Sequence, residues 1–189
     1  MEIAFIGDVH GKIDLMYSLI SDIRRTHDHN VDSVFQIGDF HAIRDKDDLK
    51  HFPVKEKYRT LGDFPKYFEG GRVPIKTYFI GGNHENNFWH SQHPEGHELI
   101  GGLNYLGRSG IKNIQDINLA WVSGNYSKKD FSESNSKKRK YNHFTKEDLD
   151  IILHQSNGEK IDVLMLHDWP AIRELEKHIS GDVQNPENL

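Results

Sequence analysis

The feature that most constrains this chain is an apolar run followed by glycine, which occurs several times. Residues 2–6, 33–37 and 75–80 are three such runs. Between the first two, apolar residues recur with helical spacing and predict a helix over residues 13–25. A strand, a helix and a strand within about thirty residues form a βαβ unit, whose crossover is right-handed. We therefore expect an α/β protein built on parallel strands.

The second half of the chain has shorter β-like runs. Several lie between residues 103 and 124, and residues 162–166 form another apolar run. Their shortness favours a second sheet with some antiparallel pairing. Thr145 is a candidate cap for a helix over 146–156, whose expected core-facing residues are Leu149, Ile152 and Leu153. The predicted architecture is a two-sheet mixed β-sandwich flanked by helices, in one domain over residues 1–189.

Potential metal ligands follow the predicted strands. In chain order they are Asp8, His10, Asp39, Asn83 and His167. The carboxyl ends of parallel strands lie along one rim of an α/β sheet, where ligands bind. Carboxylate, imidazole and amide oxygen suit Mn, Fe, Zn or Ni in mixed N/O sites. A single Gly-Asp after a strand usually only forms a turn, so it is the ordered series that predicts a metal site.

The composition limits the possible partners and the expected location of the protein. The chain has no cysteine and a net charge of −5, with 35% hydrophobic and 28% charged residues. This charge argues against a general nucleic-acid coat, which usually needs a basic face, although residues 125–142 are locally basic. No stretch approaches the ~18 apolar residues of a membrane span, and no signal peptide is visible. We expect a cytoplasmic protein with no membrane partner; the oligomeric state stays open.

The strand-end motifs resemble those of the calcineurin-like metallophosphoesterases. These motifs are Gly-Asp-x-His-Gly at 7–11, Gly-Asp at 38–39, Gly-Asn-His-Glu at 82–85 and the later His167. Within that superfamily the chain is most similar to the RNA lariat debranching enzymes. The runs at 38–44, 81–85 and 167–170 carry this second resemblance, which covers most of residues 1–175.

The resemblance implies a role for each residue. Asp8 and His10 would bind a first metal ion, and Asp39 would bridge to a second. Asn83 and His167 would bind that second ion. His84 would act above the metals as an acid or as a donor to the phosphoryl oxygen. His41 and Arg44 are candidate substrate contacts.

The function implied is that of a hydrolase, most simply a phosphodiesterase. Two divalent ions, manganese among the candidates, would activate a hydroxide that attacks phosphorus. The substrate would be a phosphoester, with RNA or a nucleotide suggested by the debranching resemblance.

Two departures from the family pattern leave alternatives open. Eukaryotic debranching enzymes commonly carry Cys where Asp8 stands, so a phosphomonoesterase or protein phosphatase is a second hypothesis. The family normally ends its site with Gly-His-x-His, and no such segment follows Pro170. A C-terminally truncated form would lack one imidazole on each metal. A third hypothesis is therefore a metal-deficient homologue that binds phosphate-containing ligands without turnover.

Overall fold

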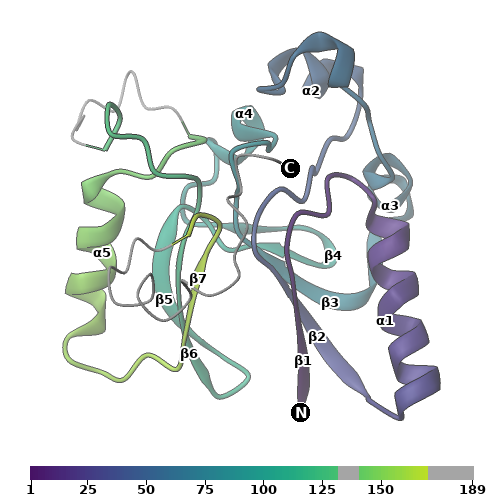
Figure 1. Cartoon of the computed structure of the whole chain (residues 1–189), viewed down its shortest axis with the longest axis horizontal. Helices are drawn as coiled ribbons and strands as arrows, with labels where there is room; N and C mark the ends of the chain where they lie inside the picture. Colours follow the sequence, from purple (N-terminus) through teal and green to yellow (C-terminus); the bar gives the residue numbers. More distant parts are fainter. Residues whose placement is uncertain (132–140, 170–189) are drawn as a thin grey trace, which may run out of the picture.

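Two β-sheets form the centre of the molecule. In the computed structural model, which describes residues 1–131 and 141–169, they lie side by side with helices on the outer faces (Figure 1). The first sheet has the order β1-β2-β3-β4, and all its strands are parallel. These strands are β1 (Glu2–Ile6), β2 (Val31–Gln36), β3 (Arg72–Phe79) and β4 (His97–Tyr105).

The second sheet is mixed. Its strands are β5 (Ser109–Ile114), β6 (Ile117–Val122) and β7 (Val163–Leu166). Strand β6 pairs antiparallel with β5 and parallel with β7. The prediction of a two-sheet mixed α/β fold is confirmed.

Helices cover the outer sides of both sheets. Helix α1 (Ile13–His27) and helix α3 (Phe64–Gly70) lie against the first sheet, and α5 (Lys146–Ser156) lies against the second (Figure 1). Two short helices, α2 (Lys46–His51) and α4 (Asn87–His90), and a 3-10 turn, η1 (Glu56–Tyr58), stand at the rim. The sequence also predicts a last helix over residues 171–178 and a frayed tail after it, and both lie outside the described residues.

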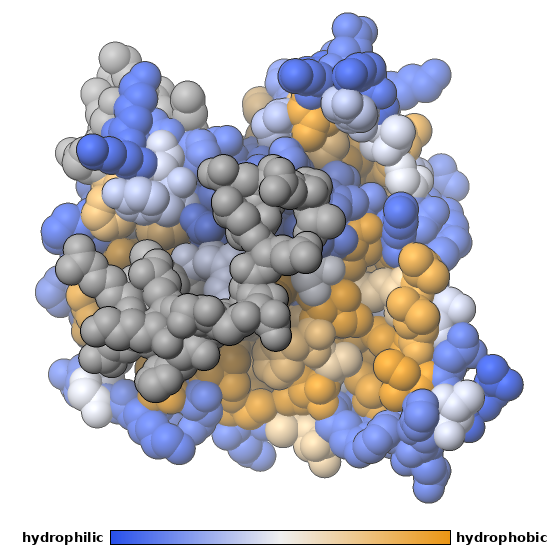
Figure 2. All heavy atoms as spheres, in the orientation of Figure 1, coloured by the Kyte–Doolittle hydropathy of each residue, from blue (hydrophilic) through white to orange (hydrophobic). Residues whose placement is uncertain are grey.

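The hydrophobic core has two parts. One joins the first sheet to α1, where Ile13, Met16 and Ile20 are buried. The other joins residues of both sheets, including Phe35 and Trp121, and so forms the inside of the sandwich. On the face shown in Figure 2, hydrophobic residues gather over β1 and α1, while hydrophilic residues cover α2. Among the described residues no helix is long and apolar enough to cross a membrane.

Three details differ from the sequence prediction. Of the run at 104–106, Asn104 and Tyr105 end the longer strand β4, which pairs with β3 in the first sheet rather than joining the second, and Leu106 follows the strand. Helix α2 forms within residues 41–74, whose polar sequence predicts irregular structure. The Asp45 side chain accepts hydrogen bonds from the first N–H groups of this helix and so caps it. Leu153 is 70% exposed and not part of the core; α5 instead turns Asp148 inward, where Arg108 binds it at 2.7 Å.

Candidate metal centre

The loops after β1 and β2 are joined by main-chain hydrogen bonds. The N–H of His10 donates to the carbonyl oxygen of Asp39 at 2.8 Å, and the N–H of Gly11 donates to that of Phe40 at 3.1 Å. The loop after β3 joins them, because the N–H of His84 donates to Asp39 Oδ1 at 2.8 Å. The strand-end residues of three strands are thereby held in one place.

A second set of bonds ties the other sheet to the same rim. The Ser123 hydroxyl accepts from the N–H of Gly81 at 2.9 Å and donates to the carbonyl oxygen of Gly107 at 2.6 Å. From the end of β7, His167 Nδ1 lies 2.9 Å from the carbonyl oxygen of Ile37. His167 is thus brought to the first sheet although it follows a strand of the second.

The loop backbone is strained at the ligand positions. Asp8, His10, Asp39 and His41 all have positive φ, at 47°, 47°, 56° and 64°. This left-handed region is uncommon for residues other than glycine. Such strain persists only where the surroundings hold it, and it clusters at active sites and ligand clamps.

Two glycines make room for the site. A Cβ at Gly38 would lie 2.4 Å from His167 Nδ1, and a Cβ at Gly82 would lie 2.1 Å from Asp39 Oδ1. Real Cβ atoms do not approach other atoms this closely. The glycines that follow β2 and β3 are therefore required for the imidazole and the carboxylate to occupy their places.

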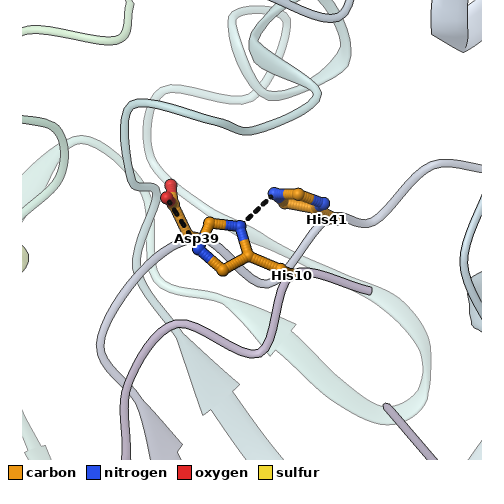
Figure 3. Close-up of side chains that lie close together, drawn as sticks. All are labelled: His10, Asp39 and His41. Atoms are coloured by element: carbon orange, nitrogen blue, oxygen red, sulfur yellow. Dashed lines mark hydrogen bonds and ion pairs between the residues drawn. The ribbon is translucent and has the colours of Figure 1, made fainter. Parts of the chain in front are cut away.

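Asp39 is the centre of the cluster. Its carboxylate lies 3.7 Å from His10 Nε2, 3.2 Å from His84 Nδ1 and 3.5 Å from His167 Nε2. Figure 3 shows Asp39 on one side of the His10 ring and His41 on the other. Asp8 is exposed, with Oδ1 3.5 Å from His10 Nε2.

These side chains form two groups that share Asp39. One group is His10, Asp39 and His41, and the other is Asp8, Asp39 and His167. Within each group the potential ligand atoms all lie within 4.8 Å of one another. A shared carboxylate is the arrangement that a pair of neighbouring cations needs.

The hydrogen bond of His167 fixes its tautomer. A carbonyl oxygen only accepts, so His167 Nδ1 must donate to Ile37. In the neutral ring, Nε2 then carries the lone pair, and it faces Asn83 Oδ1 at 3.2 Å as well as Asp39. Three acceptors that converge in this way repel one another unless a metal cation, or a proton on Nε2, lies among them. The residues present therefore fit a divalent metal ion.

A hydrogen bond to a neighbouring imidazole orients His10 in a similar way. Its Nδ1 lies 3.0 Å from His41 Nε2, so one ring donates to the other. Burial, and then the nearby His10 and His84, lower the pKa of His41 to about 3, which keeps the His41 ring neutral. A neutral acceptor at this position lets His10 carry its proton on Nδ1 and present the lone pair of Nε2 to Asp8 and Asp39.

Sequence reasoning gave no role to Glu85, which is buried beneath the site. Its carboxylate accepts from the N–H groups of Phe40 and His41 at 2.5 and 3.0 Å and so holds the loop after β2. Burial, and then the charge of Asp39, raise the pKa of Glu85 to about 8. The Gly-Asn-His-Glu motif contained this residue, but its position next to His84 did not reveal the loop that it holds.

Arg44 stands apart from the cluster. Its guanidinium makes two hydrogen bonds to Asp48, at 2.8 and 2.7 Å, and lies over the Trp89 ring at 4.1 Å. The structure thus brings together Asp8, His10, Asp39, Asn83, His84 and His167, with His41 beside His10. Contact of His41 or Arg44 with substrate stays a prediction.

The fold and the cluster of potential metal ligands agree with the comparison to known protein families. The model of the calcineurin-like phosphoesterase family matches residues 1–187. The chain belongs to the calcineurin-like phosphoesterase family.

The resemblance to the debranching branch is also confirmed. The chain is similar to the lariat debranching enzymes of Drosophila pseudoobscura, Schizosaccharomyces pombe and Arabidopsis thaliana, at 32% identity to each. The matches cover 90%, 97% and 90% of this chain, but only 33%, 39% and 43% of those relatives. The chain therefore spans between a third and about two fifths of the length of the relatives it matches.

Proposed function

We propose that this domain hydrolyses phosphodiester bonds with two bound divalent metal ions. The observation that carries the proposal is the convergence of acceptor atoms on Asp39, from His10 on one side and His167 on the other. The names of the relatives favour a diester over a monoester, and an RNA or nucleotide over other diesters. A cytoplasmic location stays a prediction.

The chain's own residues would divide the work. Asp8 and His10 would hold one ion, and Asn83 and His167 would hold the other. Asp39 would contact both ions. The donor set suits Mn, Fe, Zn or Ni. When bound, such ions lower the pKa of water to near neutrality and stabilise phosphoryl charge.

His84 is the proposed proton donor to the leaving oxygen. Its ring is part-exposed, and Nδ1 lies 3.2 Å from Asp39 Oδ2, so the carboxylate orients the ring. Nε2, on the other side of the ring, lies 3.3 Å from Asn83 Nδ2. An amide nitrogen only donates, so the neutral ring accepts here and must take up a proton on Nε2 before it can donate one. A histidine that a carboxylate orients and that carries a proton on Nε2 is suited to general-acid catalysis.

The test compares two aryl esters after loading with Mn. We expect hydrolysis of an aryl phosphodiester in preference to an aryl phosphomonoester, and loss of turnover in Asp39→Asn. Faster monoester turnover would favour the phosphomonoesterase or protein phosphatase alternative. Oligonucleotide binding without metal uptake or turnover would favour the metal-deficient alternative and overturn the proposal.

A further inference from the structure

A cavity of about 560 Å³ opens beside the metal centre. His10, His41 and His84 form one wall, and residues of the segment 52–60 form the rest. Its volume falls within the roughly 300–1,000 Å³ of small-molecule sites. His10 and His84 belong to the metal centre and also line the cavity. When the phosphate of a substrate lies at the metal centre, the group attached to that phosphate can therefore occupy the cavity.

The segment 52–60 contributes an exposed aromatic ring to the lining of the cavity. Tyr58 lines the cavity and is 62% exposed. The 3-10 turn holds its backbone, since the N–H of Tyr58 donates to the carbonyl oxygen of Lys55 at 2.8 Å. Phe52 also lines the cavity; it is buried and packs edge-on against His41 with 4.7 Å between ring centroids. An exposed aromatic ring on a fixed wall is suited to stacking with a planar group.

The charge of the wall suits a phosphorylated ligand. Lys55 lines the cavity, and Lys57 Nζ lies 4.7 Å from the centre of the Tyr58 ring. None of the described residues that line this cavity is acidic, although the chain as a whole has a net charge of −5. A planar group joined to an anion matches this combination better than an aliphatic or cationic group would.

We propose that this cavity, the nucleoside pocket, binds the nucleoside attached to the scissile phosphate, with the base stacked on Tyr58. The inference deepens the proposed function and relies on it for the position of the phosphate. The contact between base and ring does not depend on metal or on turnover, so it can be tested by itself.

The binding test uses adenosine, which has no phosphate, with the metal-free protein. Chemical shifts of the protein are followed by NMR as adenosine, or ribose as the matched sugar without a base, is added. We expect adenosine to shift resonances of Tyr58 and Phe52 and ribose to shift neither. Tyr58→Ala should weaken adenosine binding roughly 5- to 150-fold, the range expected for loss of a stacked base. Tyr58→Phe keeps the ring and should bind as the unmodified protein does.

The kinetic test uses two esters with the same leaving group. These are adenosine 5′-(4-nitrophenyl) phosphate and methyl 4-nitrophenyl phosphate, with the Mn-loaded protein. Tyr58→Ala should lower kcat/KM for the first ester and leave it unchanged for the second. Equal losses with both esters, or adenosine binding that is unchanged in Tyr58→Ala, would overturn the nucleoside pocket. Failure to hydrolyse either ester would contradict the proposed function instead, and the binding test would still decide on the pocket.

Discussion

Gly82 lies so close to Asp39 that a single added methyl group would occupy the place of the carboxylate. The Cβ of an alanine there would be 2.1 Å from Oδ1 and 2.5 Å from the main-chain nitrogen of Asp39. We predict that Gly82→Ala moves Asp39 and lowers metal affinity and turnover by at least about tenfold, although no ligand is removed. Metal titration calorimetry measures the affinity.

The matched control for this change is Gly70→Ala. Gly70 is the last residue of α3, and a Cβ there would meet no atom of the described residues within 4 Å. Alanine is favoured over glycine in a helix by up to about 1 kcal/mol, so this variant should be as stable as the original chain or slightly more so. Normal metal binding by Gly82→Ala would contradict the role given to the glycine.

The contact of His41 with His10 leads to a second prediction. His41→Phe removes the acceptor from His10 Nδ1 and should weaken metal binding roughly 10- to 100-fold, as is typical when a ligand loses its supporting hydrogen bond. His41→Gln keeps an acceptor oxygen and should retain most of the affinity. If the two variants bind metal equally well, His41 does not orient His10.

Burial of His90 predicts a pH dependence of stability. Its ring stacks on Tyr105 with centroids 4.3 Å apart, and burial lowers its pKa to about 3. An unfolded histidine titrates near 6.5, so between about pH 6.5 and 3 the unfolded chain binds more protons, and this contribution to stability is lost as the pH falls. From pH 7 to 5 the loss amounts to about 2 kcal/mol.

Replacing this ring with an apolar one should remove that loss. His90→Phe should show a smaller fall in the free energy of unfolding between pH 7 and pH 5, measured by urea denaturation. His154→Gln, at an exposed position on α5, is the control and should follow the original chain. An unchanged pH dependence in His90→Phe would show that another group is responsible.

The sequence was enough to predict the fold class and the rim, because both depend on short-range patterns. The apolar runs that became β1, β2 and β3 end next to their ligands, and parallel strands align those ends. The full length of strand β4 was harder to predict from the sequence, because His97, Glu98 and the glycines Gly101 and Gly102 interrupt its apolar pattern. Helix α2 contains only one large apolar residue, Leu49, and so gives no helical period.

Contacts between loops could not be read from the sequence. Glu85 and Ser123 act on segments distant from them in the chain, and their partners emerge only once both sheets are placed. The outward turn of Leu153 has the same origin, because the buried pair of Arg108 and Asp148 sets the rotation of α5.

The metal content of the protein tests the central claim most directly. The chain is loaded with Mn, freed of excess metal by gel filtration and analysed by mass spectrometry of the elements, in parallel with Asp39→Asn. We predict close to two metal ions per chain for the original protein and fewer than one for the variant, because Asp39 is shared by both ligand groups. No bound metal in the original protein, or two ions retained in Asp39→Asn, would contradict the account.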